Sequence, residues 1–536
     1  MLAMAVFLGA VIVIGSPYAP VVQPCPESIE EIWAIEDARR ESETPLVTSL
    51  FNQDMPLAYD RENNVFYCTL GLENGDGWPA LHLTAPGAKD TELVFVDDYT
   101  YDGCADAIRE GYAYQILAYT DEAFSYAEIV FTGLPLVMIE CGEEIGDVDV
   151  PMEIAVSSYG EEPVISAGNV HQRGKGSKGK EKLNLKIEFT RGAGGKKNTV
   201  NLPGFGLKEE VLLNPMVFDE LLVRERISWT IYAQMLGDAR QEAFGARQTN
   251  YAEVFLNGVY YGVYLMVESM DEATELKKSG DSHLLTDQVY RTLPMRFAGE
   301  RPMLRSPVYD AAGFELRYEP TGSREFAGMK DYLDLMVEED DAAFAAKAEA
   351  CIDIESVARY ALLMQGAGLM DNSNNNVYIW HKKTPEGMKY QFIPWDMDMS
   401  WGSAFGDAAK KLGEQYDNWR AFEMVDRIIA LNAGGAADRM VQLWRQWREE
   451  IFTLEHVTML MQGYFAELSD SGALVRNAQR WDMDADTEGY DILEFADMRF
   501  AVLDEAMNIV ENRGDEPPSF LRNIGGRTDS FPILDN

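Results

Sequence analysis

The apolar pattern of this chain changes along its length, and that change limits the folds it can adopt. Between residues 57 and 132, short alternating apolar runs such as Val65–Thr69 are separated by Asn, Gly and Asp, which predicts strands. Beyond Ala408, apolar residues follow helical spacing over 419–432, 435–452, 454–468 and 492–511. Strands gathered early and helices gathered late are typical of an α+β protein. A chain of 536 residues can hold two or three domains.

The middle of the chain predicts a more specific order of elements. Strands are expected from Leu134 to about Leu202, followed by a helical pattern over Asn214–Gly237. A hairpin over Tyr251–Glu268 turns at Asn257-Gly258, a pair typical of two-residue hairpin turns. Another helix is expected over Ile354–Gly368. Strands with a glycine turn, a helix and then a hairpin are the layout of a protein-kinase amino-terminal lobe.

The charge balance excludes one class of partner and favours another. The chain has 89 acidic and 46 basic residues, a formal net charge of −43. Nucleic acid and anionic lipid are bound by basic surfaces, so neither is an expected partner. The one concentrated basic segment runs from Arg173 to Lys186. A local basic segment on an acidic protein favours an acidic ligand, and nucleotide phosphates would suit it.

The amino-terminal segment and the cysteines bear on location. Residues 1–15 are almost wholly apolar and lead to small residues near Ala19, which favours a secretory signal over 1–19, with an uncleaved anchor as the alternative. No later stretch is expected to span a membrane. The five cysteines form no zinc spacing. A bridge between Cys68 and Cys104 and a set of five reduced thiols both remain open.

One polar segment contains the residue set of a phosphoryl-transfer site. Asp371 precedes Asn376 by five positions, the spacing of a kinase catalytic loop, in which the Asp orients the acceptor hydroxyl and the Asn binds a metal ion. Asp396 follows the apolar run Phe392–Trp395, where a charge without a partner or a metal is costly. Asp396 is therefore a predicted magnesium ligand. Asp398 either binds a second ion or caps the following turn.

A glycine-rich turn in the basic segment suits phosphate. In the pattern Gly174-x-Gly176-x-x-Gly179, backbone N–H groups can approach a phosphate closely. Lys182 and Lys186 follow the turn. We expect Lys182 to make the main phosphate contact and Lys186 the second.

Four segments of the chain, in the right order, resemble the CotH kinase family, atypical kinase-fold proteins associated with spore coats and secreted bacterial proteins. Gln391–Gly402 is similar to the family's Pro-Trp-Asp-x-Asp-x-Ser-Phe-Gly signature, with Trp401 in place of Phe. Arg173–Ser177 resembles its Arg-Gly-Asn-Ser-Ser segment, and Glu253–Gly258 resembles its Glu-Val-Tyr-Leu-Asn-Gly hairpin. Residues 314–320 and 352–356 also resemble family segments.

The resemblance implies an atypical, two-lobed kinase-like fold over residues 134–515. The amino-terminal lobe would cover 134–272 and the helical carboxy-terminal lobe 273–515. They would follow a lead-in over 20–56 and a small all-β, sandwich-like module over 57–133, and precede a tail over 516–536.

The same resemblance implies a secreted or surface-exposed bacterial enzyme. It would transfer the γ-phosphoryl group of ATP to Ser or Thr of surface or extracellular proteins, with Mg²⁺ or possibly Mn²⁺. Arg173 and Ser177 would join the phosphate contacts. Glu268 lies where a kinase hinge would present backbone groups to adenine.

Departures from the family pattern keep a second function open. Lys175, Leu183 and Glu188 stand where the family has Asn, Lys and Lys, all in the nucleotide-binding element. They favour an inactive kinase-fold scaffold of a cell surface or spore coat. Asp396 and Asp398 also suggest the paired carboxylates of a glycosidase, but that alternative leaves the spacing from Asp371 to Asn376 unexplained.

Overall fold

The computed structural model describes residues 19–174, 179–192, 195–292, 310–311, 314–321, 327–336, 338, 340–369, 371–373, 375–403, 423–483 and 489–513. Contacts divide the chain into two compact units. Unit 1 comprises Met1–Glu220, Gln248–Ser269 and Gly463–Thr487; unit 2 comprises Leu221–Arg247, Met270–Gln462 and Glu488–Asn536. The secretory signal predicted over 1–19 lies outside the described residues apart from residue 19, and the tail over 516–536 lies wholly outside them.

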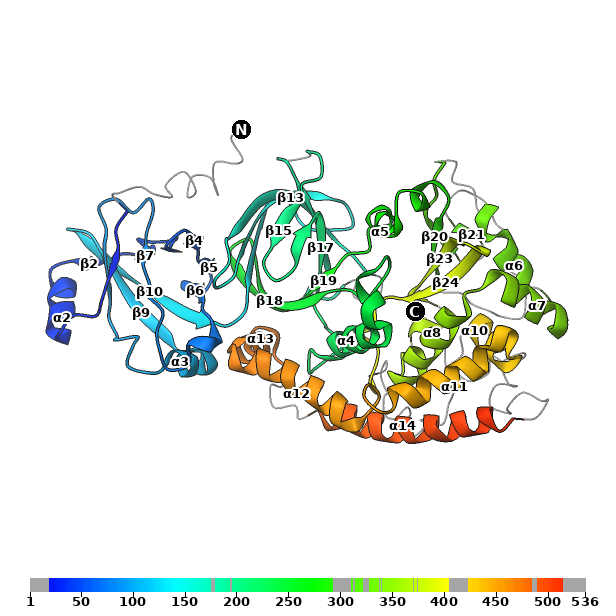
Figure 1. Ribbon diagram of the computed structural model, residues 1–536. Coiled ribbons are helices and arrows are strands. Elements are labelled where there is room, and N and C mark those ends of the chain that lie inside the picture. Colours follow the sequence, from blue (N-terminus) through cyan, green and yellow to red (C-terminus); the bar gives the residue numbers. More distant parts are fainter. Residues whose placement is uncertain are drawn as a thin grey trace. The chain divides into compact units, whose positions relative to one another are not determined.

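Unit 1 begins with a β-rich region (Figure 1). A seven-stranded sheet has the order β1-β8-β9-β10-β6-β5, with β2 also paired to β10. Its strands are β1 (Val22–Gln23), β2 (Arg40–Glu41), β5 (Ala58–Asp60), β6 (Val65–Thr69), β8 (Glu92–Phe95), β9 (Ala113–Tyr119) and β10 (Ala123–Thr132). A three-stranded sheet contains β3 (Phe51–Asn52), β4 (Met55–Pro56) and β7 (Leu83–Thr84). The helical segments are α2 (Ile29–Asp37), η2 (Leu72–Asn74) and α3 (Cys104–Glu110), of which the strand pattern over 57–132 did not predict η2 or α3.

The cysteines of the chain form no disulfide bond among the described residues. Cys68 and Cys104 are both fully buried in one hydrophobic core. All five cysteines are free thiols. The open alternative of a bridge between Cys68 and Cys104 is therefore not what the structure contains, although the two residues do share a core as their common β-rich segment predicted.

The second part of unit 1 is a closed seven-stranded barrel of order β11-β12-β13-β14-β17-β19-β18. The strands are β11 (Leu136–Cys141), β12 (Val150–Ser157), β13 (Val164–Gln172), β14 (Leu185–Thr190), β17 (Glu210–Asn214), β18 (Thr249–Leu256) and β19 (Val259–Glu268). A separate pair joins β15 (Val200–Leu202) and β16 (Gly206–Lys208). All neighbours in the barrel are antiparallel except β11 and β18, whose parallel pairing closes it. Buried aliphatic and aromatic side chains fill its interior, as expected for a barrel this small.

The predicted hairpin is confirmed as β18 and β19, turning at Asn257-Gly258. A second apolar cluster, which includes Tyr67 and Phe255, joins the amino-terminal sheet to the barrel wall. Helix α13 (Ala473–Trp481), from near the end of the chain, packs on β19. There Trp481 Nε1 donates a hydrogen bond to the Tyr261 carbonyl, 3.1 Å away.

Unit 2 combines one antiparallel sheet with most of the helices. The sheet has the order β21-β22-β20-β23-β24, made of β20 (Gln288–Thr292), β21 (Asp310–Ala311), β22 (Phe314–Tyr318), β23 (Val377–Thr384) and β24 (Gly387–Pro394). The α-helices are α4 (Arg224–Leu236), α5 (Glu272–Ser279), α6 (Lys330–Met336), α7 (Asp341–Cys351), α8 (Ile354–Gly366), α10 (Glu423–Ala430), α11 (Ala436–Trp447) and α14 (Tyr490–Glu511). Short 3-10 segments are η3 (Gly237–Gln241), η4 (His283–Leu285), η5 (Ala327–Met329), η6 (Asp371–Ser373) and η7 (Ala433–Gly435).

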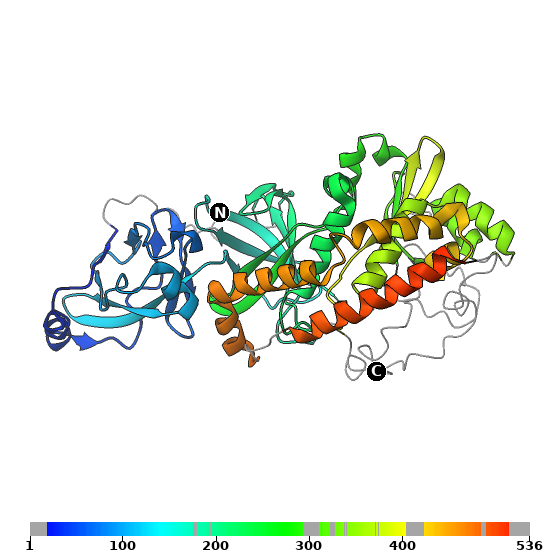
Figure 2. The ribbon, with the colours of Figure 1, turned by 60° about the horizontal axis from the view of Figure 1, so that its bottom comes forward.

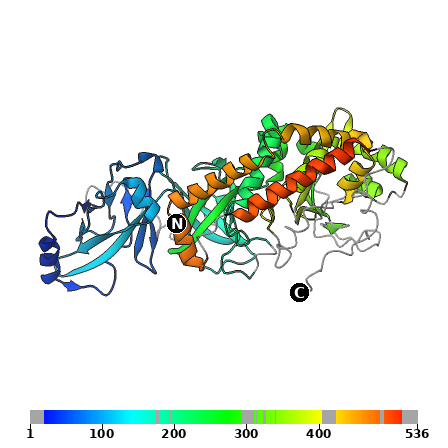
Figure 3. The ribbon, with the colours of Figure 1, turned by 90° about the horizontal axis from the view of Figure 1, so that it is seen from below.

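A helix is present in each of the four stretches expected beyond Ala408, although residues 419–422 of the first stretch lie outside the described residues. Figures 2 and 3 both show α14 lying alongside α11. Helix α12 (Leu454–Asp470) belongs to unit 2 up to Gln462 and to unit 1 after it. In the described part of the chain, no helix is both long and apolar enough to cross a membrane. The α+β class predicted from the sequence is confirmed.

Helix α8 and the strand that follows it place the polar loop of the candidate site. The Asp353 side chain caps α8 by accepting the Ser356 N–H at 3.0 Å, and the helix continues as predicted through Gly366. From the middle of the helix, the Tyr360 hydroxyl donates to the Asn372 carbonyl at 2.7 Å. A capped, buried helix therefore leads directly into the loop around Asp371.

Candidate functional site

Asp371 and Asn376, the predicted base and metal ligand, are in direct contact in unit 2. Asp371 opens η6, and Asn376 lies just before β23. The Asp371 Oδ2 atom accepts hydrogen bonds from Asn376 Nδ2 at 2.7 Å and from Asn375 Nδ2 at 3.0 Å. The segment from Asp371 to Asn376 thus folds back on itself, so that one carboxylate oxygen accepts hydrogen bonds from two amide groups.

The loop is held against the end of β24 by a buried amide. The Asn372 Nδ2 donates to the carbonyls of Asn376 and Trp395, at 3.1 and 2.8 Å. The Trp395 N–H donates to the Asn376 carbonyl at 3.0 Å. This network joins the segment that contains Asp371 to the segment that contains Asp396.

Two of the predicted metal ligands have left-handed backbone conformations. The φ angle is +53° at Asn376 and +56° at Asp396. Asn and Asp adopt this region more readily than other residues with side chains, although it still costs free energy. Such conformations gather at ligand sites because the surrounding structure must hold them in place.

The three predicted acidic residues affect one another electrostatically. Burial, and next the Asp396 carboxylate, raises the pKa of Asp371, while its amide donors and Arg291 oppose the shift. Burial raises the pKa of Asp398 well above its usual range, and the carboxylates of Asp396, Glu225 and Asp371 add to that shift. Unit 2 therefore concentrates negative charge at the predicted metal site.

Sequence reasoning missed two residues at this site. Glu225, near the start of α4, is 4% exposed and accepts a hydrogen bond from Trp229 Nε1 at 3.2 Å. Arg291, on β20, donates to Asn376 Oδ1 at 3.4 Å. Neither belongs to a recognisable motif, because each reaches the site from an element far from Asp371 in the chain.

The donor set of the predicted site suits magnesium. Carboxylate and amide oxygens are the hard ligands that Mg²⁺ prefers, and a bound divalent cation relieves repulsion between carboxylates. The described residues contain no group of three His, Cys, Asp or Glu side chains already arranged around one metal position. Asn376, Asp396 and Asp398 fit magnesium in chemistry, since one offers an amide oxygen and the other two offer carboxylate oxygens.

Lys182, the predicted main phosphate contact, lies in unit 1 and is only 5% exposed. Its Nζ donates to the Val263 carbonyl at 2.6 Å and to Asn477 Oδ1 at 3.1 Å. Burial lowers the pKa of Lys182 to about 7. Within the described chain no carboxylate forms an ion pair with it. In this structure the Lys182 amine links β19 to α13.

Lys186, and Lys197 further along the chain, are paired with glutamates. Lys186 lies 2.9 Å from a carboxylate oxygen of Glu210, which is 6% exposed in its side chain. Lys197 lies 3.5 Å from Glu188 and 3.6 Å from Glu210. The positive charge of the segment is therefore partly neutralised inside unit 1. Lys186 stays 29% exposed and can still meet a ligand.

The glycine-rich turn joins β13 to β14. Arg173 donates its backbone N–H to the Asn184 carbonyl at 2.8 Å. Gly174 and Gly179 have φ angles of +82° and +81°, a region that glycine adopts without steric cost. Gly176 and Ser177 lie outside the described residues.

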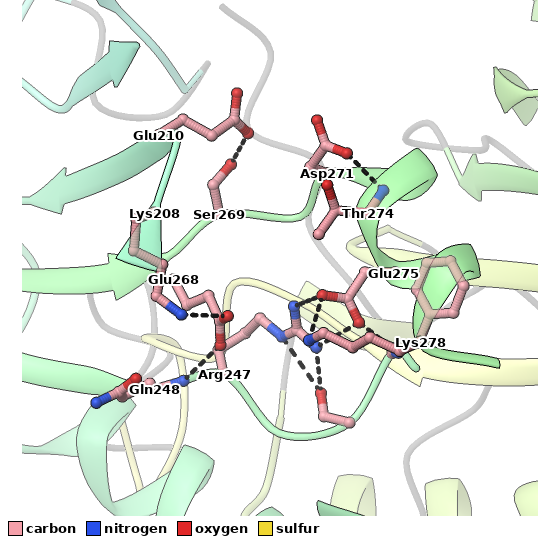
Figure 4. Close-up of polar contacts among 12 residues, drawn as sticks. Lys208, Glu210, Arg247, Gln248, Glu268, Ser269, Asp271, Thr274, Glu275 and Lys278 are labelled. Atoms are coloured by element: carbon pink, nitrogen blue, oxygen red, sulfur yellow. Dashed lines mark hydrogen bonds and ion pairs between the residues drawn. The ribbon is translucent and has the colours of Figure 1, made fainter. Parts of the chain in front are cut away.

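Glu268 ends β19 (Figure 4). Its carboxylate accepts a hydrogen bond from Lys208 at 2.7 Å, and its N–H donates to the Gln248 carbonyl at 2.9 Å. The preceding residues, Leu265–Val267, pair with both β17 and β18. Their backbone groups are therefore engaged in the barrel ladder.

Glu253 has a partner that the sequence did not reveal. Glu253 is fully buried. Arg476 of α13 binds its two carboxylate oxygens at 2.9 and 2.8 Å, and Thr132 and Tyr260 donate to the same group. Glu253 thus fixes α13 to the barrel.

The family resemblance is confirmed by comparison with known proteins. No curated protein matches the chain. The family model described as CotH kinase protein matches residues 170–503, more than half of the sequence. That range includes the glycine-rich turn, the loop around Asp371 and the carboxylates after β24. The chain belongs to the CotH kinase protein family.

Proposed function

We propose that this protein is a magnesium-dependent kinase that transfers the γ-phosphoryl group of ATP to Ser or Thr of a protein. The observation that carries the proposal is the contact between Asp371 and Asn376 beside the carboxylates that follow β24. We also propose the two-lobed kinase-like fold implied by the resemblance, and an acceptor protein at or outside the cell surface. Export rests on the apolar segment 1–15 alone.

Asp371 has the environment of a residue that orients an acceptor hydroxyl. With Oδ2 occupied by two amide donors, the carboxylate is held in one orientation. Its raised pKa makes it a better proton acceptor than an exposed aspartate. In the transfer, the acceptor oxygen bonds to the γ-phosphorus, the bond from that phosphorus to the bridging oxygen breaks and ADP leaves. The hydroxyl proton passes to Asp371.

Asn376, Asp396 and Asp398 would hold magnesium, which neutralises charge on the nucleotide phosphates when bound. In unit 1, Lys186 is the better candidate for a phosphate contact, because Lys182 is buried against Val263 and Asn477. A phosphate contact by Lys186 would resemble the paired Lys and Glu that other kinases use.

The second candidate function is a kinase-fold scaffold without turnover. It is favoured by the ion pairs in which Glu210 and Glu188 engage Lys186 and the later Lys197, because they partly neutralise the positive charge of this part of unit 1. Both candidates retain an acidic site in unit 2. They differ in whether phosphate leaves ATP.

Transfer of labelled γ-phosphate from ATP to the protein itself and to serine-rich acceptors tests the proposal. We expect wild type to transfer label with Mg²⁺ or Mn²⁺. Asp371→Asn should bind nucleotide nearly as well yet lose most turnover, whereas Asp396→Asn should lose metal-dependent binding as well.

A matched control is Asp238→Asn, which removes the same charge from an exposed position in unit 2 and should keep full transfer. If wild type is stabilised by ATP against heat but transfers no label, the scaffold replaces the kinase. If neither stabilisation nor transfer is seen, both candidates are wrong.

A further inference from the structure

Arg291 reaches the acidic site from the sheet of unit 2. On β20 it lies opposite Tyr378 of β23, and its guanidinium carbon is 5.9 Å from the Tyr378 ring centre. One guanidinium NH₂ donates to Asn376 Oδ1 at 3.4 Å, and Asn376 Nδ2 donates to Asp371 at 2.7 Å. Two consecutive hydrogen bonds thus link the Arg291 guanidinium, through the Asn376 amide, to the predicted base Asp371.

The hydrogen-bonding capacity of Arg291 is mostly unused by the described residues. A guanidinium has five N–H donors. Arg291 makes one long hydrogen bond to another described side chain, and its Nε is buried without a hydrogen-bond partner. A partly buried cation with unmet donors is costly unless a ligand completes its bonds. An anionic oxygen ligand would do so.

Another arginine of unit 2 shows the contrast (Figure 4). Arg247 is 1% exposed in its side chain, binds Glu275 through two nitrogens at 2.9 and 3.3 Å, and also donates to the Gly245 carbonyl. Such an arginine has a structural role that its contacts explain. Arg291 has no ion pair of this kind within the described chain.

We propose that Arg291 binds the terminal phosphoryl group of the nucleotide at this site. The inference rests on the proposed function and names a residue that the kinase motifs do not supply. Asn376 and Asp396 would hold the ions that bind the phosphates, and the Arg291 guanidinium that contacts Asn376 would then be available to the terminal phosphoryl group. Arginine suits the task because its planar fork matches phosphate oxygens and its charge does not depend on pH.

The chemical role of Arg291 is charge stabilisation without proton transfer. As the acceptor oxygen bonds to the γ-phosphorus and the bond to the bridging oxygen breaks, negative charge remains on the terminal oxygens. Arg291 donates hydrogen bonds to those oxygens and stays protonated throughout. The contact needs a γ-phosphate, so ADP cannot make it.

The test compares ATP with ADP. Binding of ADP and of a non-hydrolysable, imido-bridged ATP analogue to the full chain is measured by calorimetry with Mg²⁺, for wild type, Arg291→Gln and Arg291→Lys. We expect Arg291→Gln to weaken binding of the ATP analogue by about ten- to a hundredfold, the range for losing a hydrogen bond to a charged group. ADP affinity should stay within about twofold, and Arg291→Lys should recover part of the loss.

The matched control is Arg317→Gln on the neighbouring strand β22. Arg317 pairs with Glu272 and Glu315, so its loss should leave both affinities unchanged. If Arg291→Gln weakens binding of the ATP analogue and of ADP equally, or weakens binding of neither, then Arg291 is structural. In that case the inference is wrong while the proposed function stands. If wild type binds neither nucleotide, the proposed function and the inference both fail.

Discussion

The buried ion pair between Glu253 and Arg476 should be the most sensitive point of unit 1. Glu253 is fully buried, and Arg476 is 9% exposed. Arg476→Met leaves a carboxylate in the interior with only the hydroxyls of Thr132 and Tyr260 as donors. Removing one partner of a buried pair costs about 3–5 kcal/mol, because the other charge stays buried without compensation. We expect a loss of that size in the free energy of unfolding of unit 1.

The loss should also depend on pH, in a direction that the structure fixes. In wild type, burial raises the pKa of Glu253, but the charge and hydrogen bonds of Arg476, with the hydroxyl donors of Thr132 and Tyr260, together hold that pKa below its usual value. Without Arg476, burial is opposed only by the hydroxyl donors of Thr132 and Tyr260, and the pKa of Glu253 rises. The variant then loses stability as pH rises above the ordinary carboxyl pKa, whereas the stabilisation that Glu253 gives wild type is complete above that pKa and is lost only as pH falls towards the lower folded-state value. The difference between the two proteins should therefore widen from about pH 4 towards neutrality.

Hydrogen exchange of peptides from β18 and α13 measures the loss within unit 1. A loss of about 3 kcal/mol speeds exchange more than a hundredfold where opening limits it. Arg109→Met is the matched control, since Arg109 pairs with Asp470 at an exposed position where an ion pair contributes little. The double variant Glu253→Leu with Arg476→Met should lose less than the sum of the two single variants. Equal exchange in Arg476→Met and Arg109→Met would refute the reasoning.

Two further predictions concern the contact between α13 and the barrel. Burial lowers the pKa of Lys182 to about 7, so above that pH the unfolded chain binds more protons than the folded chain. The free energy of unfolding of wild type should therefore rise by about 1 kcal/mol per pH unit between about pH 7 and 10. Denaturant titrations of Lys182→Met should lack that slope. Gly262→Ala should lower the melting temperature of unit 1. The φ angle at Gly262 is +94°, and an added Cβ would lie 2.6 Å from Asn477 Oδ1 and 2.7 Å from Trp481 Nε1. The control is Gly142→Ala, which should have little effect because a Cβ there meets nothing within 4 Å.

Patterns within short stretches of sequence determined much of the candidate site. The spacing of Asp371 and Asn376 and the apolar strand before Asp396 are local features, and their proximity follows from one turn and one hairpin. Helix α8 and the hairpin of β18 and β19 were predictable for the same reason. Periodicity and turn chemistry act over a few residues, so the sequence displays them directly.

Tertiary structure alone decided which charges meet. Closure of the barrel by β11 and β18, and the pairing of Glu253 with Arg476, 223 residues further along the chain, join segments with no shared pattern. The sequence shows that residue 182 is a lysine, but only its burial against Val263 and α13 sets its pKa. Arg291 gave no signal at all until β20 paired with β23. The sequence by itself determined which residue types are present and their local geometry; the fold decided partners, burial and ionisation, because these depend on neighbours that are distant in the chain.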